Sequence, residues 1–392
     1  MPGRIRPAVA WLAKPGIFSV ALAWLMVLLV VGTIAQREIG LYEAQQRYFS
    51  CLYFWLGPVP LPGGYVAMAL VFFGLAARLG AKTRWDKRSL GINIVHIGAL
   101  ALLFGGLLTA AFSKEGAMTI VEGGKSDFIA DYHRTELALT DERGAESETV
   151  VAFGDGWLET GKLLTHASLP LGIEILRSYR NTEVRPRTAP SGDLLAPLGG
   201  AEAQAGGASD LRGFARNFEI VEAPLAKEDE RNRAGILFRV TGSRGADGIY
   251  MLVEQMSVPQ HVPVEGGQLR AELRRARTPL PFQIELVEFE QALHPGTQVA
   301  SSYSSDVVLV EGKVRQPVRI EMNQPFRHLG YTFYQASFVD GASSGRSDTT
   351  VLAVVWNVGR LFPYVSSLIM CFGLLLHLFM HMPRLMSASG NA

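Results

Sequence analysis

Two histidines lie inside long apolar runs, where a polar ring needs a specific reason. His96 stands five residues after Gly91 in an apolar stretch, about 8 Å into a helix that rises 1.5 Å per residue. A polar ring in hydrocarbon is costly and rarely faces lipid, and neutral imidazole is a good axial ligand of haem iron. The alternative is an interhelical hydrogen bond, which polar residues in helix bundles often make. Asn93, one turn earlier, could hold the ring in either case.

The second histidine, His377, lies in a leucine-rich run near the other end of the chain. We expect it at the same depth as His96, so the two imidazoles could hold one metal ion or one haem between them. Packing or an interfacial position is the alternative for His377, and His381, one turn later, is expected at the membrane interface. The other histidines have no spacing typical of a metal site. They are His133, His166, His261, His294 and His328.

Motifs for other chemistries are missing from the sequence. There is no P-loop, no G-x-G-x-x-G at a strand–helix junction, no G-x-S-x-G and no C-x-x-C-H, so no residue is assigned a catalytic role. Cys51 and Cys371 stand apart, which argues against a disulfide framework. A net charge of +1 without a basic stripe argues against nucleic acid as a partner. Aromatic residues around Cys51 form either an interfacial belt or a platform for a porphyrin; they are Tyr48, Phe49, Tyr53, Phe54 and Trp55.

The elements that must position these residues are apolar helices. Only 19% of the 392 residues are charged and 48% are hydrophobic, whereas a typical soluble domain carries about 25% charge. Four windows lack charged residues over a length close to the 20 or so residues that span a bilayer; they are residues 16–36, 62–77, 91–112 and 361–382. We therefore expect an integral membrane protein with three N-terminal spans and one C-terminal span. The first apolar run exceeds that of a signal peptide and is expected to remain as an anchor.

Lysine and arginine residues are distributed unevenly around these windows, which predicts their orientation. The loop at residues 78–90 carries five basic residues and one acid. We therefore place this loop and both termini in the cytoplasm. Residues 1–112 form a predicted three-helix transmembrane region, residues 113–358 an extracytoplasmic domain, and residues 359–392 the last span with a short cytoplasmic tail.

Residues 113–358 are numerous enough to bury their own core and are expected to be rich in β-structure. Stretches with alternating polarity predict strands at residues 135–140, 172–180, 235–241, 250–255, 282–289, 306–310, 318–322, 331–338 and 349–356. The predicted fold class is a membrane protein of the α+β type with a sandwich or barrel-like β-domain. A Gly-, Ala- and Pro-rich stretch at 189–213 predicts a flexible insertion or a boundary between two lobes. A weak echo between residues 169–175 and 280–286 fits two related lobes or chance, and the aromatics of 331–338 predict a strand buried on both faces.

The segment before the last window carries the most distinctive pattern, N-x-P-x-x-x-x-G-x-x-F-Y-Q-x-S. It is formed by Asn323, Pro325, Gly330, Phe333, Tyr334, Gln335 and Ser337. A second segment combines residues 282–290 with a His-Pro-Gly turn at 294–296 and Tyr-Ser-Ser-Asp-Val at 303–307. With the arrangement of apolar windows and His96 in the third one, these motifs resemble the ResB family of cytochrome c biogenesis proteins, also called Ccs in plastids. The resemblance covers most of the chain.

The resemblance implies a subunit of the system II machinery, which carries haem b across the bacterial cytoplasmic membrane for thioether attachment to apocytochrome c. It makes His96 an axial ligand of the transported haem, with His377 as a secondary candidate. The implied partners are a CcsA or ResC-type membrane protein, which would supply the opposing ligand, and apocytochrome c. A thiol-reducing, thioredoxin-like protein is a further partner in keeping with this role. Haem lyase activity would belong to this chain only together with the CcsA or ResC-type partner.

Two other functions fit the same residues. A non-catalytic scaffold would recruit or chaperone apocytochrome c and leave all haem to the partner, so His96 would be replaceable. An anchor subunit of a membrane redox complex would hold a resident haem b between His96 and His377. A solute transporter is disfavoured, because the apolar windows show neither repeats nor interrupted helices of the usual kind.

Overall fold

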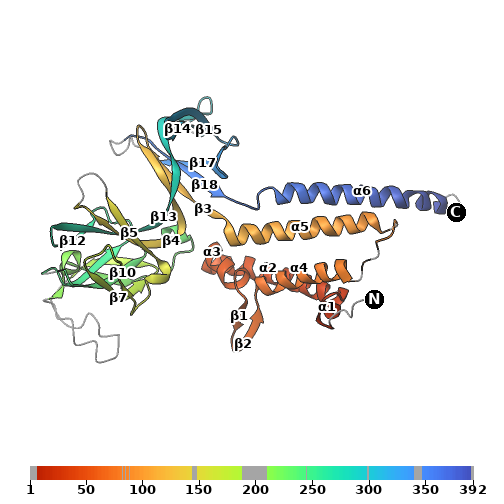
Figure 1. Cartoon of the computed structure of the whole chain (residues 1–392), viewed down its shortest axis with the longest axis horizontal. Helices are drawn as coiled ribbons and strands as arrows, with labels where there is room; N and C mark the ends of the chain where they lie inside the picture. The colour runs from red at the N-terminus through yellow and green to blue at the C-terminus, as the bar shows by residue number, and fades with distance from the viewer. Residues whose placement is uncertain are drawn as a thin grey trace. The chain divides into compact units, whose positions relative to one another are not determined.

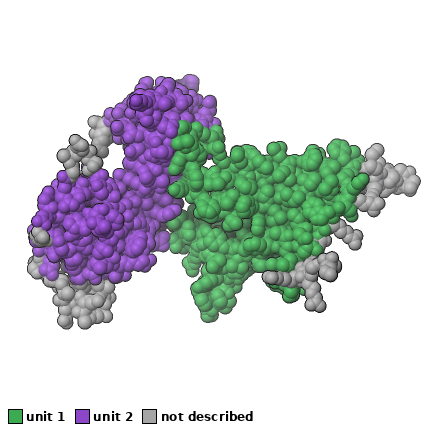
Figure 2. All heavy atoms as spheres, in the orientation of Figure 1, with its two compact units in different colours: residues 1–114, 327–332, 355–392 green, residues 115–326, 333–354 purple. Residues whose placement is uncertain are grey.

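The chain forms two units, each assembled from segments that are distant in the sequence (Figure 2). The computed structural model describes residues 7–81, 83, 85–87, 89–143, 148–187, 210–243, 245–297, 300–339 and 347–389. Unit 1 comprises residues 1–114, 327–332 and 355–392, and unit 2 comprises residues 115–326 and 333–354. Unit 1 contains the helices, and unit 2 contains most of the strands.

Unit 1 is built on four long apolar helices (Figure 1). They are α2 (Pro15–Ile39), α4 (Gly64–Ala81), α5 (Leu90–Phe112) and α6 (Phe362–Ser389). Each is long and apolar enough to cross a membrane, so the four predicted windows are confirmed as helices. A short helix, α1 (Pro7–Leu12), precedes α2, which begins at Pro15, where a fixed φ suits the first helical turn. Helix α2 ends at Ile39 and is capped by Gly40, whose φ of 85° favours glycine.

Helices α5 and α6 pack along a line of glycines. Gly91, Gly98 and Gly105 recur every seven residues on α5, so they share one face of the helix. A Cβ added at Gly91 would lie 2.5 Å from the backbone nitrogen of His377, and one added at Gly105 would collide with Phe362. Advancing along α5 therefore corresponds to moving back along α6, and the two helices are antiparallel. Small residues allow this close approach of backbones.

Short elements connect α2 to α4. They are α3 (Leu41–Ala44), the π-helix η1 (Gln45–Phe49) and the strands β1 (Tyr53–Leu56) and β2 (Val59–Pro62). The ring of Phe49 fills the space beside Gly32, where an added Cβ would lie 2.5 Å from Cε2 of that ring. The connection therefore folds back onto α2 before the β1–β2 hairpin begins.

Unit 2 is the β-rich domain that the sequence predicts. Its strands belong to long antiparallel sheets, and the strand bounds are β3 (Lys114–Val121), β4 (Lys125–Asp141), β5 (Thr149–Gly154), β6 (Leu163–Leu164), β7 (Gly172–Tyr179), β8 (Thr182–Pro186), β9 (Phe218–Glu222), β10 (Gly235–Thr241), β11 (Gly248–Val253), β12 (Gln260–Val264), β13 (Gly267–Leu293), β14 (Ala300–Glu311), β15 (Val314–Glu321), β16 (Phe326–His328), β17 (Tyr331–Val339) and β18 (Thr349–Trp356). The largest sheet has ten strands in the order β15-β14-β13-β4-β3-β18-β17-β16, with β12 beside β13 and β5 beside β4. A four-stranded sheet has the order β11-β10-β7-β6, and β8 pairs with β9.

The long strands β4 and β13 run through two packed regions (Figure 1). At one end, Leu137 and Leu273 face Ile175 and Phe238 of the four-stranded sheet, as in a sandwich. At the other end the large sheet curls into a nearly closed, barrel-like form around Phe333, which is fully buried. Both of the predicted architectures therefore occur in this domain.

The predicted strands each overlap an observed strand. The two segments that echo each other lie in different sheets, one leading into β7 and the other inside β13. The predicted insertion at residues 189–213 lies outside the described residues as far as residue 209. The prediction that residues 331–338 are buried on both faces holds at Thr332 and Phe333, which are 6% and 0% exposed, but not at Tyr334, which is 43% exposed. From Tyr334 onward, no residue of β17 is fully buried.

Candidate functional site

His96 lies on the side of α5 that is turned away from α6. It follows Gly91 by five residues, which is a rotation of about 140° from the α6-facing glycines at 3.6 residues per turn. Its side chain is half-buried, and Asn93, which lies about 60° from it around the helix, is 3% exposed. Arg78, in the last turn of α4, is close enough to interact electrostatically with His96. The imidazole therefore faces the α4 side of the bundle, and part of it is accessible.

His377 lies on α6 where that helix meets Gly91. Its Nδ1 is buried without a hydrogen-bond partner among the described residues. The ring of His381 lies beside it with centroids 4.2 Å apart, and Nδ1 of His381 is 2.8 Å from the His377 carbonyl oxygen. His377 and His381 therefore lie side by side along one face of α6, with their ring planes tilted by 34°.

The structure does not bring His96 and His377 together as opposed ligands. His377 is level with Gly91, which is about 7.5 Å along the helix axis from His96 at 1.5 Å per residue. The expectation of equal depth is wrong for the two backbone positions, because His377 packs beside Gly91 in the first turn of α5, whereas His96 lies five residues further along that helix. Whether either ring binds haem remains a prediction.

The outer histidines and the cysteines remain dispersed. His133 Nδ1 lies 2.7 Å from Asp229, and His261 Nε2 lies 3.8 Å from Glu142. In the described part of the chain, no histidine joins a cluster of three or more potential metal ligands. Cys51 and Cys371 are free thiols, and burial raises the pKa of the Cys51 thiol.

Two residues of the ResB-like pattern set turns. Asn323 has a φ of 65° and follows β15; asparagine tolerates this left-handed conformation better than most residues. Leu329 and Gly330 have φ values of 46° and 84° and connect β16 to β17, as in hairpin turns with two positive φ angles. A Cβ added at Gly330 would lie 2.8 Å from Nε1 of Trp356. This position therefore needs glycine for both backbone conformation and space.

Phe333 of the pattern is a core residue. Its ring centroid lies 6.1 Å from that of Phe282 on β13 and 5.8 Å from that of Phe326 on β16. Phe333 is fully buried, and clusters of this kind dominate the energetics of cores. Its contribution is to packing.

Gln335 joins the two sequence motifs through a buried network. The Ser305 hydroxyl donates to Oε1 of Gln335 at 2.7 Å, and the Ser305 and Thr350 hydroxyls are 2.9 Å apart. Nε2 of Gln335 donates to Thr350 Oγ1 at 3.0 Å and to the Ser337 carbonyl at 3.2 Å. Ser305 and Thr350 are fully buried, so their hydroxyls need these partners. Tyr334 is the large side chain of the pattern that points outward.

An aromatic stack lies beside this network. The rings of Phe289 and Phe338 are 5.0 Å apart and nearly parallel, and Tyr303 stands 5.3 Å from Phe338. The stack links β13, β14 and β17. The residues that mark the resemblance therefore hold these strands together, a role that their spacing in the sequence does not reveal.

An acidic cluster on β13 and β14 is occupied by an arginine. Ligand oxygens of Glu288, Glu290 and Asp306 lie within 4.8 Å of one another. Arg319 on β15 lies 2.6 Å from Glu290 and 2.8 Å from Asp306, and it also pairs with Glu321. These carboxylates hold the pKa of Arg319 above its ordinary value. The guanidinium supplies the positive charge that a metal ion would otherwise bring.

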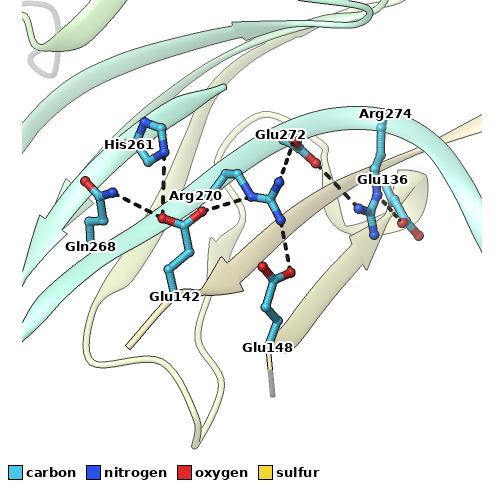
Figure 3. A network of polar contacts seen from close by, with 8 residues as sticks. All are labelled: Glu136, Glu142, Glu148, His261, Gln268, Arg270, Glu272 and Arg274. Carbon is cyan, nitrogen blue, oxygen red and sulfur yellow. Dashed lines mark hydrogen bonds and ion pairs between the residues drawn. The ribbon is translucent and has the colours of Figure 1, made fainter. Parts of the chain in front are cut away.

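A second polar network crosses the outer face of the sandwich region (Figure 3). Arg270 is central, with Glu142 at 3.2 Å and Glu148 at 3.1 Å, and Arg274 pairs with Glu136 at 3.0 Å across the β13–β4 ladder. Arg270, Glu272 and Arg274 alternate along β13, and residues spaced by two lie on one face of a strand. That alternation is the sequence signal for the polar half of β13, which was not among the predicted strands.

One carboxylate in unit 2 is almost completely buried. Glu254 is 2% exposed, and its Oε1 lies 2.5 Å from Nε of Arg275. Burial raises the pKa of Glu254, and Arg275 opposes that shift. Arg275 also donates to the Asn232 carbonyl, so the pair fixes the segment that precedes β10 onto β13.

Comparison with known proteins supports the resemblance. The model of the ResB-like family matches residues 130–353, more than half of the chain. Protein NrfI of Wolinella succinogenes is 34% identical over 102 residues, which are 26% of this chain and 11% of that protein. The match thus spans about a tenth of the length of this relative. By the extent of the family match, the chain belongs to the ResB-like family.

Proposed function

We propose that this chain is the ResB-type subunit of a system II cytochrome c maturation complex in the bacterial cytoplasmic membrane. The four apolar helices cross the membrane, with both termini and the loop at residues 78–90 in the cytoplasm. The β-domain lies on the extracytoplasmic side. Haem b is the cargo of the complex, and apocytochrome c is the acceptor. Membership of the ResB-like family is the observation that carries the proposal.

His96 is the residue of this chain that we assign to the haem iron. Its imidazole is half-buried and faces away from the close contact between α5 and α6. A neutral imidazole ligates iron through one ring nitrogen. Because His377 does not lie at the level of His96, we assign the second axial position of the haem iron to a ligand from the CcsA or ResC-type partner.

Attachment of the haem is an addition reaction. Each of two client thiols adds across a haem vinyl group, so an S–H bond breaks while a C–S and a C–H bond form. A thioredoxin-like reductant serves this step because a disulfide cannot add in this way. The complex supplies position and ligation, and the porphyrin supplies the reactive groups. The β-domain braces the partner or the client.

The two alternative functions are a haem b anchor subunit and a non-catalytic scaffold. A resident haem b between His96 and His377 is poorly supported, because the two side chains differ in level and in direction. The scaffold alternative makes a clear contrary prediction, because a protein that only recruits apocytochrome c does not need His96.

The test is maturation of c-type cytochromes in cells that carry His96→Ala as their only copy of this chain. We expect loss of covalently bound haem in His96→Ala and near-normal maturation in the matched variant His381→Ala, with both proteins present at wild-type levels in the membrane. Normal maturation in His96→Ala would favour the scaffold.

A further inference from the structure

The β1–β2 hairpin projects sideways from α2 and α4 (Figure 1) and forms a protrusion of unit 1 (Figure 2). Its base is fixed to the helices. Trp24 of α2 donates its indole N–H to the Pro62 carbonyl at 2.8 Å. The ring of Phe54, which is 8% exposed, packs edge-on against Tyr48 with centroids 5.0 Å apart. The hairpin is therefore held at a defined place by one of its faces.

The opposite face is apolar and uncovered within the described residues. Tyr53 and Trp55 are 61% and 56% exposed, and their rings pack edge-on. At the tip of the hairpin the other side is also uncovered, because Leu56 and Val59, which share the side of Phe54, are 66% and 52% exposed. A two-stranded hairpin is marginally stable in water by itself, so a face of this kind is expected to meet another apolar phase.

The prolines of β2 remove the backbone donors on one edge. Leu52 accepts a hydrogen bond from Gly63 at 2.8 Å, and the register continues with Tyr53 opposite Pro62 and Trp55 opposite Pro60. Hydrogen-bonded and non-hydrogen-bonded pairs alternate in antiparallel ladders. Pro60 and Pro62 therefore occupy the positions whose N–H groups would point outward, where proline leaves no orphan donor.

The other edge indicates how deep the hairpin lies. Tyr53 and Trp55 of β1 direct N–H and C=O groups away from β2, and the described residues contain no third strand beside them. Such groups need partners that the hydrocarbon core lacks but water and lipid headgroups provide. Tyrosine and tryptophan also concentrate at the headgroup level. The hairpin thus suits the interface rather than the bilayer centre.

Charge favours lipid over a protein partner. No Asp, Glu, Lys or Arg occurs from Tyr48 to Ala77, whereas a protein interface normally has a polar rim around its apolar centre. The same uncharged stretch continues directly into α4. The hairpin and the apolar helix therefore share one kind of surroundings.

We infer that the β1–β2 hairpin is an interfacial anchor whose Tyr53 and Trp55 face rests in the headgroup region of the bilayer, at the end of α4 opposite the loop at residues 78–90. This inference rests on the membrane placement in the proposed function and not on its haem chemistry. The anchor fixes the depth of α4.

The test uses the full chain in lipid nanodiscs, with one fluorescent label at a time in a Cys51→Ser, Cys371→Ala background. The probe site is Leu56→Cys. Leu368→Cys on α6, where the native side chain is 72% exposed, is the lipid control, and Lys313→Cys in the β14–β15 turn is the water control. Quenching is measured with lipids brominated near the headgroup, with lipids brominated near the chain end, and with iodide in the buffer.

We expect the Leu56 probe to be quenched most strongly by bromine near the headgroup and weakly by iodide. Quenching by iodide as strong as that of the Lys313 probe would overturn the inference, as would shielding from all three quenchers, which would indicate a protein neighbour. If the Leu368 probe is quenched by iodide and by neither lipid, the membrane placement is wrong and the inference falls with it. None of these quenching measurements depends on haem binding. A failure of the haem proposal would therefore leave their result unchanged.

Discussion

Gln335 shares a buried network with Ser305 and Thr350, and both hydroxyls are fully buried. Phe333 occupies the core beside this network, and Gly330 allows the turn before it. At the scale of residues, the pattern that resembles ResB proteins is therefore explained mainly by folding of the β-domain. Tyr334, which points outward, is the large residue of the pattern that remains available for contact with another molecule.

Ser305→Ala tests the buried network. Removing the hydroxyl leaves Gln335 and Thr350 short of a partner, which costs about 1–3 kcal/mol for buried polar groups. We expect a lower melting temperature of the full chain in detergent. Ser302→Ala, on the same strand but exposed, is the matched control and should change stability by less than about 0.5 kcal/mol. Equal melting temperatures for the two variants would contradict a stabilising network.

Glu254 predicts a pH dependence of stability. Burial raises the pKa of Glu254 in the folded state, above the value of about 4.3 of an unfolded chain. The folded state therefore holds this proton more tightly, and its contribution to stability is present below the unfolded pKa and lost as pH rises through the folded pKa. The melting temperature of wild type relative to Glu254→Gln should fall as pH rises above about 4.3, the pKa of an unfolded glutamate. If the melting temperature of wild type instead rose relative to that of Glu254→Gln with rising pH, the pKa of Glu254 would be lowered by folding, which contradicts the prediction.

At the scale of elements, the glycine line of α5 fixes its contact with α6. A Cβ at Gly98 would lie 2.6 Å from Cγ of Met370, whereas one at Gly106 would meet nothing within 4 Å. Gly98→Val should lower the melting temperature, because overpacking costs about 1–3 kcal/mol. Gly106→Val, on the same helix, should leave it nearly unchanged. Equal melting temperatures for Gly98→Val and Gly106→Val would contradict the close packing of α5 on α6 at Gly98.

Much of the element order follows from the sequence. The apolar windows predicted α2, α4, α5 and α6 because a bilayer sets the length of uncharged helix. Alternation predicted β10 and β18 with their observed bounds. Strand β13 was found only at 282–289 because its first half carries Arg270 and Arg274, whose ion pairs make the charged face compatible with a sheet. The β1–β2 hairpin was missed because its prolines and short strands lack alternation.

The candidate site was less predictable. Sequence places His96 and His377 in apolar helices, but their relative level depends on which residue of α6 packs beside Gly91. The link between Gln335 and Ser305 depends on strand order, which no local pattern reveals. Spacing therefore identified the residues, and packing decided which of them meet.

At the scale of the whole molecule, the chain enters the β-domain after α5 and returns to α6, so helices and sheets are parts of one continuous path. In the proposed function the helices receive haem through His96, and the β-domain serves the partner or the client on the extracytoplasmic side. Each unit alone would lack one part of this task. In that proposal, assembly with the CcsA or ResC-type partner would complete the coordination of the haem iron.

The most direct test of this account is the haem absorption spectrum of the purified complex with its CcsA or ResC-type partner. Wild type, His96→Ala and the control His377→Ala are compared, each with and without added imidazole. We predict that His96→Ala loses bound haem, that imidazole restores it by replacing the missing ligand, and that His377→Ala retains a wild-type spectrum. An unchanged haem content and spectrum in His96→Ala would contradict the assignment of His96 to the iron and, with it, the haem-delivery function.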